Sequence, residues 1–183
     1  MLHKKQSYVS EIAEELEIEL KILYHQRPTI SCGEKLGLLR ENSQFKDWTL
    51  DRIVKALYFH RNNQSYIGFI TPEFGGNVEP KEIFPEVLKI SRSGAERYWI
   101  NPSHVPMGMS WGTCTPFPLP FSVGGEIRDI IILDYPQIND KLVDISIGGT
   151  GIESFKTSMH LPYKSIYEIL SRKFGDRIHL YRC

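Results

Sequence analysis

One stretch near the middle of the chain, residues 101–125, is so rich in proline and glycine that neither a helix nor a strand can continue through it. Patterns typical of helices and strands flank it on both sides, so the fold must carry a long irregular loop. Loops of this length inside a compact domain are uncommon, and those that occur are often functional. We therefore expect part of a functional site in this loop. Its turn-forming residues are Pro102, Pro106, Gly108, Gly112, Pro116, Pro118 and Pro120.

The residues before this loop predict a mixture of helices and strands. Apolar positions at helical spacing give way to apolar positions at every second residue, and turn residues separate the segments. The expected elements, in order, are a helix with Tyr8, Ile12, Ala13 and Leu16 on its apolar face; a strand with Ile18, Leu20, Ile22 and Tyr24 on one face; a short helix with a capping box from Ser31 to Glu34; strands over 53–59 and 66–71 that form a hairpin through a turn at 61–64; a helix over 80–90 that Pro85 interrupts; and a short strand over 97–100.

The residues after the loop predict strands over 129–133 and 142–147, the second of which ends at Gly148 and Gly149. A final helix begins near Pro162 and is capped by Gly175. Residues 164–183 carry five basic and two acidic side chains, a local net charge of +3, which usually marks a solvated helix face and less often a contact for an RNA stem. The pattern predicts a single α/β domain of the α+β type over residues 1–183, with a mixed β-sheet or partly closed barrel surrounded by helices.

Charge and composition limit the class of protein. With 22 Lys and Arg against 22 Asp and Glu, the net charge is zero, whereas proteins that grip many phosphates are usually basic. Nucleic acid should therefore be held only over a short stretch or at an end. No apolar run approaches the ~20 residues of a membrane helix, and no signal peptide is visible. Cys32, Cys114 and Cys183 are widely spaced and odd in number, so we expect a cytoplasmic protein with no membrane partner.

Lys55 is the first candidate site residue, because it interrupts an apolar strand on the face that carries Leu57 and Phe59. A lysine among apolar residues costs desolvation unless it has a partner or reaches water. One interpretation is an edge-strand lysine whose stem packs while its ammonium reaches solvent. The other is a cation at a pocket mouth, where it meets a phosphate or a polarised carbonyl. The strand alone favours the first interpretation.

Two glycine segments are the next candidates. Gly108 and the Gly-x-x-x-Pro spacing from Gly112 to Pro116 allow backbone N–H groups to approach a ligand and form an oxyanion hole. Gly148 and Gly149 follow a strand directly, so they form either an ordinary turn or a wall against which a substrate lies. The second segment lacks the lysine and the spacing of a phosphate-binding loop, which argues against a nucleotide triphosphatase.

Cys114 is a candidate nucleophile, with His104 or His160 as its base. No local signature of a cysteine hydrolase surrounds it, and a cysteine between threonines is more often a packing residue. The six histidines form neither an H-E-x-x-H motif nor a pairing with a C-x-x-C motif, so nothing in the sequence supports a metal site.

Taken in order, these motifs resemble the YbaK-type aminoacyl-tRNA deacylases, which are similar to the editing domain inserted in bacterial prolyl-tRNA synthetases. The resemblance covers residues 12–174, with an apparent insertion at 41–50. The segments that carry it are the lysine strand at 53–59, the Gly-x-x-x-Pro loop at 112–116 with Phe117 and Leu119, the strand and glycine pair at 144–149, and the closing helix at 162–170.

The resemblance implies hydrolysis of the ester that joins a small amino acid, such as Ala, Cys or Ser, to a mischarged tRNA of the proline type. It implies no metal or other cofactor, and an attacking water oriented by the substrate's own ribose hydroxyl. The resemblance implies that Lys55, Gly108 and Gly112 are the catalytic residues. The partners it implies are the tRNA acceptor end and an aminoacyl-tRNA synthetase. The residues expected to bind substrate are Tyr24, His25, Thr113, Thr115, Pro116, Gly148 and Gly149.

Two other functions stay open from the sequence. One is a non-catalytic module that binds tRNA ends or a synthetase, in which Lys55 would contribute only to binding. The other is a hydrolase of a different ester that depends on Cys114. Replacement of Lys55 or of Cys114 distinguishes the three functions.

Overall fold

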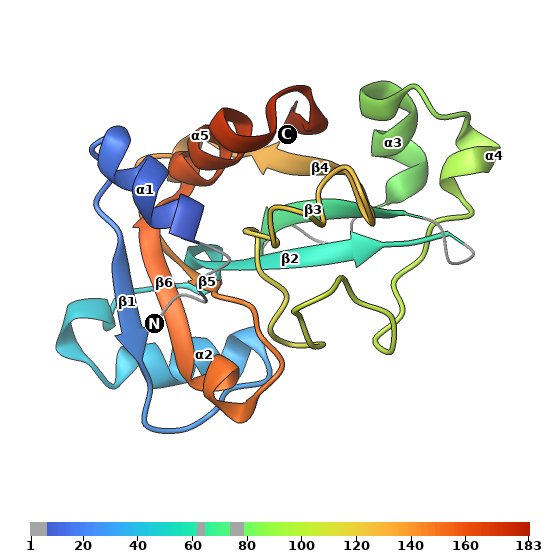
Figure 1. The fold of residues 1–183 in the computed structure, drawn as a ribbon. Helices are drawn as coiled ribbons and strands as arrows, with labels where there is room; N and C mark the ends of the chain where they lie inside the picture. The colour runs from blue at the N-terminus through green and yellow to red at the C-terminus, as the bar shows by residue number, and fades with distance from the viewer. Residues whose placement is uncertain (1–6, 62–64, 74–78) are drawn as a thin grey trace.

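The computed structural model describes residues 7–61, 65–73 and 79–183, and its centre is one mixed sheet of seven strands (Figure 1). The strands lie in the order β1-β6-β5-β2-β3-β4-β7. The strands β2 and β3 form the expected antiparallel hairpin, whereas β5 runs parallel to β2, and β4 lies parallel to both β3 and β7. Their bounds are β1 (Lys21–Tyr24), β2 (Ile53–Phe59), β3 (Tyr66–Pro72), β4 (Ile127–Asp134), β5 (Leu142–Ser146), β6 (Thr157–Pro162) and β7 (Ile178–Arg182).

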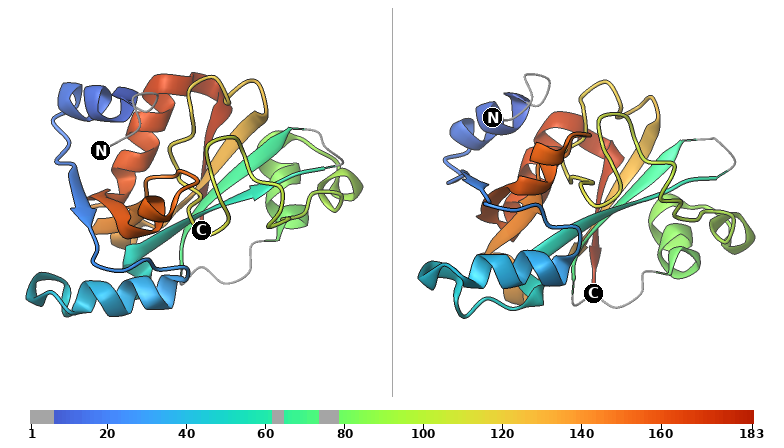
Figure 2. Two further views of the ribbon diagram at one scale, coloured as in Figure 1. Left: turned by 60° about the horizontal axis from the view of Figure 1, so that its bottom comes forward. Right: turned by 90° about the horizontal axis from the view of Figure 1, so that it is seen from below.

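Helices cover both faces of this sheet (Figure 2). Alternation along β4 sends Ile130 and Ile132 into one cluster, with α1 and α5, and sends Ile131 and Leu133 into the other, with α3. Figure 1 shows α1 beside α5, with α3 and α4 at the far end of the hairpin. The helix bounds are α1 (Ser7–Glu15), α2 (Cys32–Arg40), α3 (Pro80–Leu88), α4 (Arg92–Ala95) and α5 (Tyr163–Phe174), and five short 3-10 turns are η2 (Ser43–Phe45), η3 (Leu50–Arg52), η4 (Pro136–Ile138), η5 (Ile152–Lys156) and η6 (Gly175–Arg177).

The start of α2 confirms the capping signal in the sequence. The Ser31 hydroxyl accepts a hydrogen bond from the Glu34 N–H at 3.2 Å. The Glu34 carboxylate accepts from the Ile30 N–H at 2.9 Å, one residue before the position of a standard capping box. Both bonds fix the direction in which the chain enters α2, which matters because this entry forms one wall of the cavity described below.

The insertion at 41–50 packs against the sheet. Phe45 is buried with Leu36, Leu39 and Ile53, and the rings of Phe45 and Trp48 each lie 5.0 Å from the imidazole of His160. The insertion therefore covers buried polar residues of β6.

The fold class is the expected single α+β domain with a mixed sheet, but several elements differ from the prediction. The sheet is open, because β1 and β7 stand at opposite ends of the strand order. The residues at 97–100 form only an isolated bridge from Trp99 to His60. The strands β6 and β7 were not predicted. The strand β7 forms the end of the basic tail, most of which belongs to the expected helix α5. Most of the turn expected at 61–64 lies outside the described residues.

The helix α3 continues through Pro85 instead of breaking there. A proline inside a helix removes one hydrogen bond and crowds the preceding turn. The neighbouring Phe84 is fully buried, with its ring 5.7 Å from that of Phe59 and 5.5 Å from that of Tyr98. Aromatic packing therefore offsets the local cost of the proline. No helix in the part of the chain that the structure describes is long and apolar enough to cross a membrane.

Candidate functional site

A cavity of about 210 Å³ opens where two neighbouring strands separate. The strands β2 and β5 pair only through Ile53 with Asp144 and Val54 with Ile145. Five consecutive residues of β2, 53–57, line the cavity, from the paired residues onward to the part of the strand where β5 no longer pairs. Consecutive residues of a strand face opposite sides of a sheet, so a lining of this kind means that the cavity lies against the edge of β2. The other walls come from residues 29–32 before and at the start of α2, from the proline- and glycine-rich loop, and from η5.

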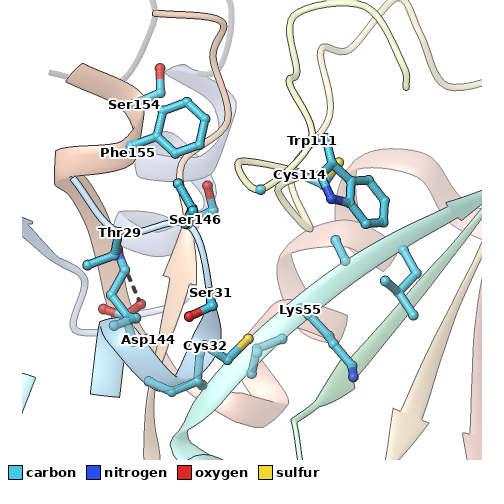
Figure 3. A pocket seen from close by; sticks show the side chains of 17 residues that line it. Thr29, Ser31, Cys32, Lys55, Trp111, Cys114, Asp144, Ser146, Ser154 and Phe155 are labelled. Carbon is cyan, nitrogen blue, oxygen red and sulfur yellow. Dashed lines mark ion pairs between the residues drawn. The ribbon is translucent and has the colours of Figure 1, made fainter. Parts of the chain in front are cut away.

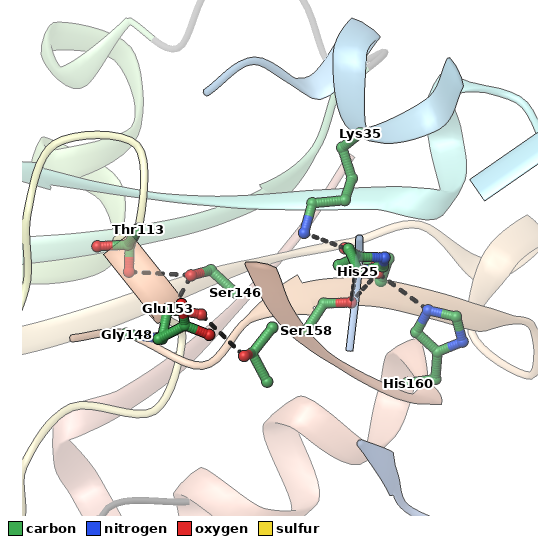
Figure 4. A network of polar contacts seen from close by, with 10 residues as sticks. His25, Lys35, Thr113, Ser146, Gly148, Glu153, Ser158 and His160 are labelled. Atoms are coloured by element: carbon green, nitrogen blue, oxygen red, sulfur yellow. Dashed lines mark hydrogen bonds and ion pairs between the residues drawn. The ribbon is translucent and has the colours of Figure 1, made fainter. Parts of the chain in front are cut away.

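The wall from the loop is formed by residues 111–114 and is anchored to the glycine pair after β5. The Thr113 hydroxyl donates to the Gly149 carbonyl at 2.8 Å, and the Gly149 N–H donates to the Gly108 carbonyl at 2.8 Å. The Ser146 hydroxyl donates to the Thr113 carbonyl at 3.0 Å (Figure 4). These hydrogen bonds join the glycine segment of the loop to the glycine pair after β5, two segments that were predicted separately from the sequence. Gly108 and Gly149 contribute through their backbone groups, which bond directly to each other.

Glycine is required at two positions of this wall. Gly112 has φ +90°, and a Cβ there would lie 3.2 Å from the Phe155 ring. Gly149 has φ +113°, and a Cβ there would overlap the Ser154 hydroxyl. Side chains rarely adopt positive φ values, so both positions would be strained by substitution.

Replacing Gly149 by alanine is expected to lower the free energy of unfolding by about 1–3 kcal/mol, because the backbone strain and the overlap with Ser154 add. Denaturant unfolding measures the change. The matched control is Gly33→Ala in α2, where a Cβ meets nothing within 4 Å and stability should stay the same or rise by up to about 1 kcal/mol. Equal stability of the two variants would contradict the role given to Gly149.

Lys55 lies on β2, between β5 and β3 in the strand order. Because β5 pairs only with Ile53 and Val54, the β5 side of β2 is an open edge at Lys55, as the interpretation of an edge-strand lysine expects. Its ammonium forms an ion pair with Glu73 at 3.1 Å, and its side chain is 26% exposed. Figure 3 shows the side chain running from β2 to the margin of the cavity, on the side away from Cys114 and Trp111. Lys55 is thus a partly exposed cation at the edge of the cavity rather than a group pointing into its centre.

A buried polar network lies at the opposite end of the cavity, around Asp144. One carboxylate oxygen, Oδ2, accepts hydrogen bonds from the Ser158 hydroxyl at 2.5 Å and from Nε2 of His160 at 2.9 Å. Ser158 also contacts Nε2 of His25 at 2.8 Å (Figure 4). The other oxygen, Oδ1, lies 3.9 Å from the ammonium of Lys35. The strands β5 and β6, the residue after β1 and the helix α2 therefore all contribute to the network around one carboxylate.

The pKa values define the charges in this network. Burial by itself would raise the pKa of Asp144, but the hydrogen bond from His160 and the charge of Lys35 outweigh burial and hold it below its ordinary value. Burial lowers the pKa of His25 to about 4, and the charge of Lys35 acts in the same direction. Asp144 is therefore ionised and His25 neutral at pH 7. The single proton of the Ser158 hydroxyl goes to Asp144, so Nε2–H of His25 donates to Ser158.

Cys114 lines the cavity but is not arranged as a nucleophile. Burial raises its pKa to about 11, and its thiol donates to the Ser110 carbonyl at 3.6 Å. Among the described residues, no histidine lines the cavity. His104 accepts a hydrogen bond from the Asn101 amide and stacks on His60, while His160 is held by Asp144.

The other predicted residues divide by location. Tyr24 and His25 line a separate hollow with Leu38 and Phe45, and Tyr24, expected on the apolar face of its strand, is 68% exposed. Thr115 and Pro116 are buried behind the wall, where the Thr115 carbonyl accepts a hydrogen bond from Tyr58. Lys55 and Gly112 line the cavity, while Thr113, Gly108, Gly148 and Gly149 form or anchor its wall. Lining residues not predicted are Thr29, Ser31, Lys35, Trp111, Asp144, Ser146 and Ser154.

No protein-family model matches the sequence, and no curated protein matches it. Solved structures do match. The crystal structure of a hypothetical protein, APE2540, has a TM-score of 0.61 at 17% identity and covers 94% of this chain and 97% of that chain. A scaffold protein from epitope backbone grafting by computational design has a TM-score of 0.52 at 13% identity and covers 99% and 97%. At these identities the likeness shows the fold alone.

Proposed function

We propose that the protein is a cytoplasmic hydrolase that acts in trans on mischarged tRNA and cleaves the ester between the amino acid and the terminal ribose. The observation that carries the proposal is the small cavity between the Gly112 loop and the edge of β2, with a cation at its margin. The resemblance of the sequence to YbaK-type deacylases supports the same reaction.

The size and the margin of the cavity suit the end of an aminoacyl-tRNA. About 210 Å³ holds a small aminoacyl group but leaves the nucleotide outside. Trp111 is 48% exposed at the cavity and offers a surface on which the terminal base can stack. Lys55 reaches the margin, where the phosphate next to the terminal nucleoside would lie. A grip on one base and one phosphate also agrees with a net charge of zero.

The reaction needs a water molecule and a site for the developing oxyanion. Water adds to the ester carbonyl, the bond to the ribose oxygen breaks, and that oxygen takes a proton as free amino acid and tRNA are released. Among the described backbone carbonyls, none accepts a hydrogen bond from the N–H of Gly112 or of Cys114, so these groups are available to stabilise the oxyanion. An aminoacyl ester is already activated, so positioning and oxyanion stabilisation supply the catalysis without a protein nucleophile.

The direct test is deacylation of a panel of tRNAs carrying labelled small amino acids, in the presence of a chelator. Loss of one or two small amino acids at a rate indifferent to the chelator supports the proposal. If tRNA binds and no ester is hydrolysed, the protein is a binding module for tRNA ends instead. The Lys55→Ala protein, considered in the Discussion, serves as the catalytic control.

The Cys114→Ser protein is expected to keep its deacylation rate within about fivefold of the unchanged protein, because the thiol forms part of the wall and its raised pKa keeps it protonated. Initial rates on the preferred aminoacyl-tRNA measure this. A thousandfold loss, together with trapping of an acyl-enzyme on the unchanged protein, would assign the reaction to a Cys114 nucleophile.

A further inference from the structure

The end of the cavity beneath α2 contains an ion pair that is too long to be a hydrogen bond. Lys35 and Asp144 both line the cavity, and their side chains are 12% and 2% exposed. The ammonium nitrogen and Oδ1 are 3.9 Å apart, beyond the 2.7–3.2 Å of an N–H···O bond. Each group thus has unused hydrogen-bonding capacity in a place with little access to water.

The rest of the network keeps the carboxylate in this position. Ser158 and His160 both donate to Oδ2, so rotation of Asp144 toward Lys35 would break two hydrogen bonds. Among the described residues, no donor lies within hydrogen-bond distance of Oδ1. The gap between Oδ1 and Lys35 is therefore held open by bonds on the far side of the carboxylate.

A second unsatisfied group lies in the same cavity. Thr29 is 95% buried, and its hydroxyl has no hydrogen-bond partner among the described residues. Its backbone N–H donates to the Phe155 carbonyl at 3.1 Å, which fixes the main chain. Thr29 and Asp144 both line the cavity, and Figure 3 draws them on the same side of it, across from Trp111. Buried hydroxyls are nearly always paired, so an unpaired one points to a missing ligand group.

The chemistry of these three residues selects among ligand groups. An ammonium would donate to Asp144 but be repelled by Lys35, and a carboxylate would accept from Lys35 but be repelled by Asp144. A methyl group or a thiol would leave both charges poorly paired. A hydroxyl accepts from Lys35 and donates to Asp144 at once, and the unpaired Thr29 hydroxyl lines the same cavity.

We propose that Lys35, Asp144 and Thr29 recognise a hydroxyl on the side chain of the aminoacyl group, so that the preferred substrates carry serine or threonine rather than alanine or cysteine. The inference rests on the proposed function and narrows its substrate. A site that bonds a buried hydroxyl discriminates strongly against the analogue without it, because its own polar groups are then left unpaired.

The first experiment compares kcat/KM for tRNA charged with Ser, Thr, Ala and Cys. We expect seryl-tRNA to be hydrolysed at least about tenfold faster than alanyl-tRNA, the factor that one hydrogen bond to a charged group gives. The seryl-to-alanyl ratio should fall toward one in Lys35→Met and to a smaller extent in Thr29→Val, which keeps the shape of the side chain. The matched control is Lys21→Met, because Lys21 pairs with Glu19 on the surface and the ratio should not change. Equal rates on seryl- and alanyl-tRNA would overturn the inference.

A second measurement separates failure of the inference from failure of the proposed function. NMR titration compares two non-hydrolysable probes, 3′-amino-3′-deoxyadenosine carrying serine or alanine in amide linkage. Tighter binding of the seryl amide without hydrolysis of any ester keeps the hydroxyl recognition and overturns the deacylase. Hydrolysis of seryl- and alanyl-tRNA at equal rates, with equal binding of both amides, keeps the deacylase and overturns the hydroxyl recognition. Binding of neither amide, with no ester hydrolysed, overturns both.

Discussion

A protein carrying Lys55→Ala is expected to hydrolyse its aminoacyl-tRNA about 10- to 100-fold less efficiently while keeping its stability. The partly exposed ammonium at the margin of the cavity forms an ion pair with Glu73 at 3.1 Å, and a phosphate arriving at the margin would compete with Glu73 for the ammonium. A hydrogen bond from a cation to an anion contributes roughly 1.5–3 kcal/mol to binding, and this difference sets the expected factor. Values of kcat/KM measure the loss, and thermal unfolding checks the fold.

Two short substrates identify what Lys55 contacts. Aminoacyl-adenosine 5′-phosphate retains the phosphate that Lys55 would hold, and aminoacyl-adenosine lacks it. Lys55→Ala should slow hydrolysis of the first and leave the second almost unchanged. Equal losses on both would place Lys55 at the ester carbonyl instead. If Lys55 only neutralises Glu73 in the folded protein, Glu73→Gln should lower activity and stability as much as Lys55→Ala does. We expect instead that Glu73→Gln lowers activity less than Lys55→Ala.

The fold was predictable wherever the burial of a segment follows its hydrophobicity. In some segments the apolar residues recur throughout at one spacing, either that of a strand or that of a helix. These segments are β2, β3, β4, β5 and α5, and the structure contains all of them. The strand β6 does not follow this rule, because Ser158 and His160 are polar and yet almost completely buried. They are tolerated through their bonds to Asp144 on β5, a partner fourteen to sixteen residues away. Periodicity within one segment carries no information about such a partner.

Only those residues of the candidate site that carry a signal in their own sequence segment could be predicted. The Gly112 loop and Lys55 carry local signals, a glycine spacing and a charge on an apolar strand. Asp144 carries the same kind of signal, because it lies between Val143 and Ile145, but acidic residues near turns are common and do not indicate a site by themselves. Lys35 has no sequence feature that distinguishes it from an ordinary surface lysine on a helix. Its position becomes informative only when the fold brings the Lys35 ammonium to within 3.9 Å of the Asp144 carboxylate on β5.

Replacement of Asp144 by asparagine is expected to lower the free energy of unfolding by about 3–5 kcal/mol at pH 7, since the change removes one charge from a buried pair and leaves Lys35 uncompensated. For a chain of this length the midpoint of thermal unfolding should fall by about 10 °C. The exposed Asp140 pairs with Lys164 at 2.7 Å, so Asp140→Asn is the matched control and should leave the midpoint nearly unchanged.

The pH dependence of this difference tests its electrostatic origin. The pKa of Asp144 is lower in the folded protein than in the unfolded chain, so between the two values the unfolded chain binds more protons. The stabilisation is therefore complete above the ordinary aspartate pKa of about 4 and is lost as the pH falls through the folded value. The unchanged protein and Asp144→Asn should converge in stability at acid pH. A difference that stays constant from pH 7 to pH 3 would instead assign the loss to packing, and would remove the fixed negative charge on which recognition of the substrate hydroxyl depends.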